Sequence, residues 1–159
     1  MMIIFQCFGG THTSVAAASI YLGRLPRTRK PRLQEVLALP YFDRVDNCCT
    51  GTLNYLGRDR RHNPVFVLGS GRWRAEVRAV LSLFHRICEP DKVPVALIDC
   101  FPEATWPVRL GGFLSRRLGL TAPGRPLVGR GILQGYPRYV KLVERFEEDP
   151  APYLLQRSS

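Results

Sequence analysis

The first 23 residues carry the pattern that most restricts how this chain can fold. An apolar run of strand length, Met2–Phe8, is followed by the loop Gly9–Ser14 (GGTHTS) and by Val15–Leu22, a helical stretch that is apolar on nearly every side. An uninterrupted apolar strand is typical of the centre of a parallel sheet that is covered on both faces. The helix must also be well buried. Its three consecutive alanines allow close contact with a sheet, and Gly23 suits a left-handed helix end.

Strands and helices are expected to alternate along the rest of the chain. Thr52–Leu56 and Val65–Leu68 have β-rich compositions and are joined by a polar connection, which predicts a hairpin. Further strands are predicted at Val93–Ile98 and, after a GRP turn, at Leu127–Val128. Helices are predicted at Arg32–Leu39, in a long amphipathic segment that follows Gly71, at Thr105–Leu118 and at Pro137–Glu148.

This order of elements predicts an α/β fold with a single domain over residues 1–149 and a loosely held tail over 150–159. We expect a mostly parallel sheet of about five strands, with helices on both faces and one inserted β-hairpin. The long amphipathic helix should bury an apolar face made of Trp73, Val77, Val80, Leu81, Phe84, Ile87 and Cys88. The last helix should bury Tyr139, Val140, Val143 and Phe146.

The composition is ordinary for a soluble globular protein, with 45% hydrophobic and 23% charged residues. No apolar stretch reaches the roughly 18 residues that cross a bilayer, and the start shows no secretory signal pattern. The five cysteines are an odd number without a C-x-x-C pair, so most are expected to be small buried hydrophobes. These features predict a cytoplasmic protein that has no contact with membranes.

The net charge of +10 is compatible with nucleic acid, with anionic ligands or with a basic surface that has no specific partner. The positive residues are dispersed over several short groups, without a single run that is interleaved with aromatic residues, which disfavours nucleic acid. The groups are Arg24 to Arg32, Arg58 to Arg61, Arg72 to Arg78 and Arg116-Arg117.

The GGTHTS loop is the strongest candidate for a binding site. In open α/β sheets, ligands bind at the carboxyl ends of the strands, where strand-to-helix loops meet. Gly9 and Gly10 permit a sharp turn, and the start of the following helix offers N–H groups and a partial positive charge. Hydroxyl donors come from Thr11, Thr13 and Ser14, and a candidate acid/base group from His12. Alternatively, a Thr or Ser only caps the helix and the glycines only make a turn.

Two further features should reach the same edge of the sheet. Gly69, Ser70 and Gly71 form a second glycine-rich turn, close to Arg72 and Arg74, that could contact phosphate or simply reverse the chain. Asp99 ends a buried strand, where an acidic side chain can hold Mg²⁺ but more often caps a helix or anchors a loop. A fourth feature is the glycine pair Gly111-Gly112, which suggests close backbone packing.

Several established motifs are absent. The loop lacks the lysine and the glycine spacing of a phosphate-binding P-loop, and Arg74 stands where a dinucleotide fingerprint needs its third glycine. Cys7 raises a nucleophilic alternative, but no arginine closes its loop. G-x-S-x-G is missing, and the three histidines lack zinc-ligand spacing with the cysteines. The sequence therefore indicates no metal site and no particular cofactor.

Taken together, these segments resemble a family of small proteins from spore-forming Gram-positive bacteria, domain of unknown function 3189. The resemblance covers most of the chain. It lies in the strand–GGTHTS opening with its alanine-rich helix, in LALPYFD, in the paired YLG and VFVLG segments, and in RLGGFLSRRLGL followed by GRPLV. It implies a small intracellular α/β protein from such a bacterium, and it brings no activity, cofactor or catalytic residue. Cys48-Cys49 stand where a more polar turn is expected in relatives.

Two functions remain open from the sequence. In the first, GGTHTS holds a nucleotide or another phosphorylated small molecule, Thr13 or Ser14 positions the phosphate, and His12 contacts it or acts as a general acid/base. Gly69, Ser70, Gly71 and Asp99 would complete that site. In the second, the chain is a non-catalytic interaction protein that uses its basic surface or aromatics such as Trp106 and Tyr136 to bind a protein or nucleic acid.

Overall fold

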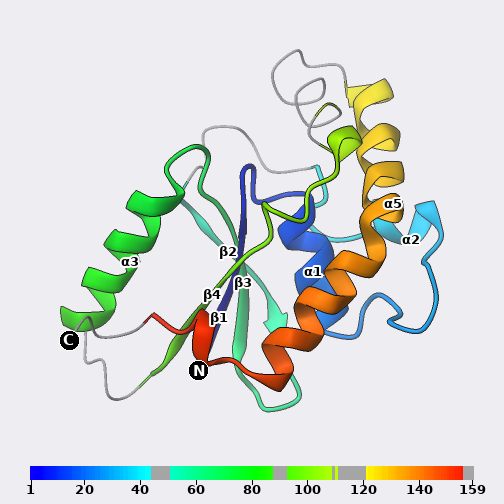
Figure 1. Cartoon of the computed structure of the whole chain (residues 1–159). Coiled ribbons are helices and arrows are strands. Elements are labelled where there is room, and N and C mark those ends of the chain that lie inside the picture. Colours follow the sequence, from blue (N-terminus) through cyan, green and yellow to red (C-terminus); the bar gives the residue numbers. More distant parts are fainter. Residues whose placement is uncertain (44–50, 88–92, 109, 111–120, 156–159) are drawn as a thin grey trace.

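The computed structural model describes residues 1–43, 51–87, 93–108, 110 and 121–155. Within them, one mixed sheet contains the strands β1 (Met2–Cys7), β2 (Leu53–Arg58), β3 (Pro64–Gly69) and β4 (Val95–Asp99), in the order β2-β3-β1-β4. β1 lies between β3 and β4 and is parallel to both, and β2 is antiparallel to β3 at one edge (Figure 1).

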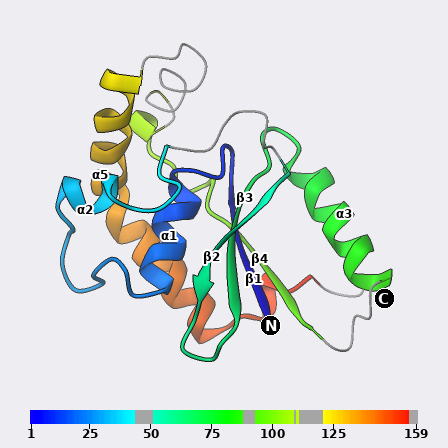
Figure 2. The same cartoon turned by 180° about the vertical axis from the view of Figure 1, so that it is seen from behind.

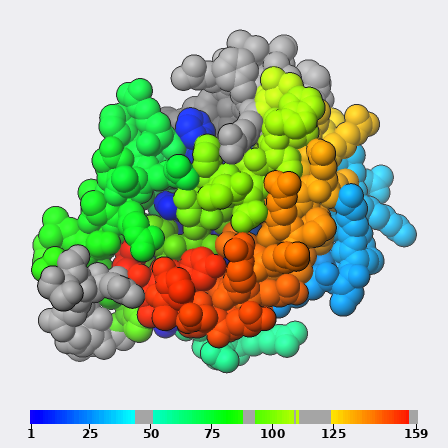
Figure 3. Space-filling model, in the orientation of Figure 1, coloured from blue at the N-terminus to red at the C-terminus, as the bar shows by residue number. Residues whose placement is uncertain are grey.

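The central position of β1 follows from its apolar sequence. Ile3, Ile4 and Phe5 are fully buried, which confirms the expected two-sided cover. Because side chains alternate along a strand, Ile3 and Phe5 join the larger core on one face, and Ile4 joins a smaller core on the other. Figure 3 shows atoms of the first residues, in blue, only as small patches between α3 and the segment after β4.

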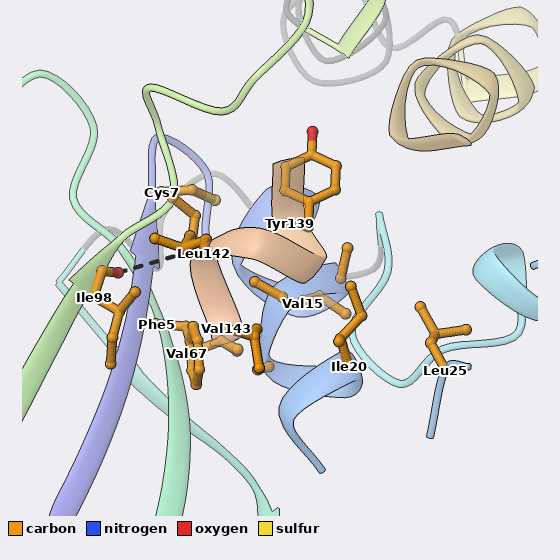
Figure 4. Close-up of a cluster of buried hydrophobic side chains, with 14 of the residues drawn as sticks. Phe5, Cys7, Val15, Ile20, Leu25, Val67, Ile98, Tyr139, Leu142 and Val143 are labelled. Atoms are coloured by element: carbon orange, nitrogen blue, oxygen red, sulfur yellow. Dashed lines mark hydrogen bonds between the residues drawn. The ribbon is translucent and has the colours of Figure 1, made fainter. Parts of the chain in front are cut away.

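One face of the sheet is covered by α1 (Thr13–Tyr21) and α5 (Thr121–Glu148), and α2 (Leu33–Leu37) packs against α5 on the side away from the sheet (Figures 1 and 2). α1 ends where the sequence predicted, with Gly23 at a φ of +71°. Phe5, Val67 and Ile98 of the sheet face Val15 of α1 and Val143 of α5 (Figure 4). The stripe expected on the last helix is also buried, from Tyr139 to Phe146.

The predicted count of five strands is wrong for the described residues, because Leu127–Val128 lies inside α5. The glycines and prolines around it are typical of turns in the sequence, but here the glycines serve helix packing. A Cβ on Gly129 would lie 2.5 Å from Leu33 Cδ1 of α2, and one on Gly131 would lie 2.8 Å from the Val108 backbone nitrogen. α5 therefore begins well before Pro137 and includes Pro126.

The antiparallel strands β2 and β3 are consecutive and are joined by residues 59–63. β3 also pairs with β1, from Ile3 opposite Val65 to Cys7 opposite Gly69. This antiparallel pair is thus part of the main sheet, and the sheet is mixed rather than mostly parallel with a separate insertion. Most of the predicted helix Thr105–Leu118 lies outside the described residues.

The opposite face of the sheet carries α3 (Arg74–Ile87), which the sequence predicted as an amphipathic helix. Only Val77 and Leu81 of its apolar side pack against the small core of Ile4, Leu68 and Leu97. The expectation of a buried apolar face is therefore wrong for the rest of it. An amphipathic pattern identifies the apolar side of a helix, but it does not say what covers that side. The exposed fractions are 49% for Trp73, 64% for Val80, 63% for Phe84 and 71% for Ile87, and Cys88 lies outside the described residues.

The segment after α5 is described as far as Leu155. A short 3-10 helix, η2 (Ala151–Tyr153), leads to Leu154, which forms an isolated bridge with Ala96 of β4. The Leu155 backbone N–H donates to Val95 O at 2.9 Å, and its side chain joins the small core. None of the described helices combines the length and the apolar character that a membrane span needs.

Two buried tyrosines of α5 differ in what their hydroxyl groups contact. Tyr136, expected above to be an exposed partner contact, is only 3% exposed, and its hydroxyl donates to Pro26 O at 2.5 Å. Tyr139 is fully buried, and no described residue forms a hydrogen bond with its hydroxyl. Burial raises the pKa of both tyrosines, to about 12 for Tyr136.

This difference predicts opposite effects of one chemical change. Tyr139→Phe should stabilise the protein by about 1 kcal/mol, because it removes a buried hydroxyl that has lost its water without gaining a partner. Tyr136→Phe should destabilise it by about 1 kcal/mol, because it removes a formed hydrogen bond. Thermal unfolding of both variants measures this, with melting temperatures expected to move by about 2–4 °C in opposite directions. Equal shifts of the same sign would contradict the assignment.

Candidate functional site

The two glycine-rich turns predicted from the sequence lie against each other at the carboxyl edge of the sheet. Since β1 and β3 are parallel neighbours, the loops that follow Cys7 and Gly69 leave the sheet side by side. The Ser70 N–H donates to Cys7 O at 3.0 Å, and the Gly71 N–H donates to Phe8 O at 2.8 Å. The structure thus brings Gly9, Gly10, Gly69, Ser70 and Gly71 together.

Only glycine fits where the two turns meet. Gly10 has a φ of +69°, and a Cβ built on it would lie 2.5 Å from the Gly69 nitrogen. A Cβ on Gly69 would lie 2.9 Å from the carbonyl carbon of Gly9. Real Cβ atoms do not come so close to backbone atoms, so each position needs a residue without a side chain.

The polar residues between these turns and α1 are buried. Thr11 and Ser14 are fully covered, Thr13 is 2% exposed and His12 is 7% exposed. His12 is the N-cap residue of α1, and its side chain does not cap the helix. Ser14 Oγ instead lies 3.1 Å from Cys7 Sγ. The N-cap position is thus occupied by His12 and not by a Thr or Ser.

His12 is held by Asp43, a residue that the sequence analysis missed. His12 Nε2 lies 3.0 Å from Asp43 Oδ1, and both side chains are almost completely buried. Because a carboxylate only accepts hydrogen bonds, Nε2 carries the proton of this contact and Nδ1 is the remaining ring nitrogen. The edge of the ring meets Phe42, with the centroids 5.6 Å apart. Asp43 lies 31 positions after His12 in the sequence, so no motif spacing predicts that the two side chains meet. Its backbone has a φ of +54°.

Cys7 takes part in the loop rather than in a disulfide. The Gly10 N–H donates to Cys7 Sγ at 3.2 Å, so the sulfur holds the turn from inside. Cys100 follows β4 beside it and is also a buried free thiol. Burial is the largest cause that raises the pKa of the Cys100 thiol. Cys48-Cys49 lie outside the described residues.

Asp99 reaches the same edge of the sheet, where its carboxylate already has two partners. Asp99 Oδ2 accepts a hydrogen bond from Arg74 Nη1 at 2.8 Å, and Oδ1 accepts one from the Phe101 N–H at 3.0 Å. The Arg74 guanidinium also lies 4.4 Å from the centre of the Phe101 ring. Asp99 thus anchors its loop and pairs with Arg74. No three residues with metal-ligating side chains come together in the described ranges, and Gly111-Gly112 fall outside them.

The contact between the two turns predicts a large loss of stability in Gly10→Ala. Placing a side chain in the left-handed region costs about 1–2 kcal/mol, and forcing the two backbones apart adds roughly 1–3 kcal/mol. Gly23→Ala is the matched control, because Gly23 has nearly the same φ, +71°, but nothing within 4 Å of its Cβ position. Denaturant unfolding should therefore show a clearly larger loss for Gly10→Ala. Equal losses of stability in the two variants would mean that backbone strain alone explains the need for glycine at position 10.

Comparison with known proteins agrees with the resemblance seen in the sequence. Residues 2–148 match the family described as "Protein of unknown function (DUF3189)". No curated protein and no solved structure matches the chain. The match covers both glycine-rich turns, the pair of His12 and Asp43, and every strand and helix of the described sheet and its cover. The chain therefore belongs to the DUF3189 family.

Proposed function

We propose that this protein binds a phosphorylated small molecule at the first turn of α1. The observation that supports the proposal most directly is the way this turn is built. The first N–H groups of an α-helix have no acceptor within the helix, and here the side chain of the N-cap residue, His12, does not cap them. Leaving such groups buried without an acceptor costs about 1–3 kcal/mol each, and a phosphate oxygen is a suitable acceptor.

The surrounding side chains support an anion rather than a cation. The helix contributes a partial positive charge at its N-terminus. Asp43 accepts a hydrogen bond from His12 Nε2 and thereby orients the ring, so that Nδ1, when it also carries a proton, donates to a phosphate oxygen. A histidine held by a carboxylate in this way is also suited to move a proton, which is the role we assign to His12 in any phosphoryl-transfer or hydrolytic step.

Ser14 is the second residue that we place in contact with the ligand. Its hydroxyl group lies 3.1 Å from Cys7 Sγ in the first turn of α1, where a phosphate oxygen would approach the helix N-terminus. Cys7 itself accepts the Gly10 N–H, so we assign to it the role of shaping the loop. Thr13 completes the hydroxyl groups of this turn.

A second candidate function is supported by a different observation, the exposed apolar side of α3. Val80, Phe84 and Ile87 recur at helical spacing and are each more than half exposed. Two arginines of the same helix, Arg78 and Arg86, and the net charge of +10 favour an acidic partner and oppose self-association. In this second proposal the chain is an interaction protein that binds an acidic amphipathic helix of another protein.

The leading proposal predicts that phosphate compounds stabilise the protein through Ser14 and His12. A thermal-shift screen with inorganic phosphate, sugar phosphates and nucleotides should raise the melting temperature of the wild type. Ser14→Ala and His12→Ala should each weaken the best ligand by about 10-fold or more, since a hydrogen bond to a charged group contributes about 1.5–3 kcal/mol.

Ser19→Ala is the matched control for this experiment. Ser19 is a fully buried serine of the same helix, and its hydroxyl has no hydrogen-bond partner among the described residues. The substitution makes the same chemical change more than one turn away from Ser14, so the affinity should stay within about twofold of the wild type. Equal effects of Ser14→Ala and Ser19→Ala, or no stabilisation of the wild type by any phosphate compound, would overturn the proposal.

The second proposal predicts that Phe84→Ser combined with Ile87→Ser changes binding and not folding. Exposed substitutions of this kind usually alter stability by less than about 0.5 kcal/mol. The double variant should keep the wild-type melting temperature and lose its affinity for a synthetic Glu/Leu amphipathic helix, as measured by fluorescence anisotropy. Unchanged binding of the peptide would argue against α3 as the docking surface.

A further inference from the structure

A second site lies at the opposite, amino-terminal edge of the sheet. An open cavity of about 700 Å³ is lined there by the turn between β2 and β3, the end of α1 and the end of α5. These three segments lie together at the same end of the molecule in Figures 1 and 2. The volume falls within the range of small-molecule sites, about 300–1,000 Å³. The length of β1, about 20 Å, separates the cavity from the first turn of α1.

The wall formed by the turn is held in place by Asp59. Its Oδ1 accepts hydrogen bonds from the backbone N–H groups of Arg61 and Asn63, each at 2.8 Å. Its Oδ2 accepts one from the Tyr21 hydroxyl at 2.7 Å and one from Asn63 Nδ2 at 2.9 Å. Both carboxylate oxygens of Asp59 thus accept hydrogen bonds from residues that line the cavity or form the turn. The backbone that carries the neighbouring arginines is fixed before any ligand arrives.

The charge of the cavity is strongly positive. Arg27, Arg58, Arg60 and Arg61 line it, against the carboxylates of Asp59 and Glu147. Arg27 and Glu147 pair with each other through two hydrogen bonds, one of 2.7 Å. Arg58 donates to His62 O at 3.0 Å. The side chains of Arg60 and Arg61 form no hydrogen bond or ion pair with another described residue, so their charge has no matching carboxylate.

We propose that this cavity binds a small molecule with two or more adjacent phosphate groups, such as a diphosphate or a triphosphate. Arginine binds phosphate through paired N–H groups, and three arginines within four residues can contact successive phosphates. A single phosphate would leave part of this charge unmatched. The concave shape favours a compact ligand over a nucleic acid, which needs an extended basic surface. This site shares no residue with the one proposed on α1.

The test compares two double variants that remove the same charge. Arg60→Ala/Arg61→Ala changes the cavity, and Arg78→Ala/Arg86→Ala changes exposed positions on α3. Isothermal titration with inorganic triphosphate should show at least a 10-fold loss of affinity for the first variant and less than a twofold change for the second. Inorganic phosphate should bind the wild type at least 10-fold more weakly than triphosphate. Ser14→Ala should retain the wild-type affinity of the cavity for triphosphate, which separates this site from the first.

Any of the following results would overturn the proposal. If triphosphate does not bind the wild type, the cavity is not a phosphate site. Equal losses of affinity in the two double variants would show that only the net charge of the protein matters. Equal affinity for phosphate and triphosphate would exclude recognition of adjacent phosphates. Tighter binding of a single-stranded oligonucleotide that also depends on Arg60 and Arg61 would assign the surface to nucleic acid. The side chains of both arginines are exposed and form no hydrogen bond with a described residue, so melting temperatures near the wild-type value should show that the variants are folded.

Discussion

The backbone of Gly10 lies against the backbone of Gly69, and the arrangement of the upper edge of the sheet depends on this contact. It joins the loop after β1 to the loop after β3, with two further hydrogen bonds from Ser70 and Gly71 to carbonyl groups of the first loop. The position of the first loop in turn sets where α1 begins. A side chain at either glycine would separate the loops and displace the helix start, so the contact connects the packing of the sheet with the geometry of the candidate site.

The candidate site is assembled from segments that are far apart in the chain. Cys7 and Gly10 shape the loop, Ser14 reaches back to the sulfur of Cys7, and Asp43 holds His12 from a separate segment after α2. Each contact orients a group that would otherwise rotate freely in solution. The site is therefore preorganised, and the free-energy cost of ordering these side chains is met on folding rather than on binding.

The two edges of the sheet differ in how they carry positive charge. At the carboxyl edge it comes from the N-terminus of α1, and the guanidinium of Arg74 is already paired with Asp99. At the amino edge it comes from arginine side chains that exceed the carboxylates around them. The two edges thus offer different chemical environments, one built from backbone groups and one from guanidinium groups.

The sequence by itself determined those elements whose local composition requires a particular degree of burial or a particular end. The apolar run of β1 requires burial on both faces, the alanine-rich α1 requires close packing, and Gly23 suits the end of that helix, so these features were predictable from local chemistry. Tertiary structure alone decided the rest. It placed Leu127–Val128 in a helix, because Gly129 and Gly131 allow α5 to approach its neighbours, and it left most of the apolar side of α3 exposed. It also joined His12 to Asp43, since a contact across 31 residues depends on how the chain returns to the sheet and has no local signal.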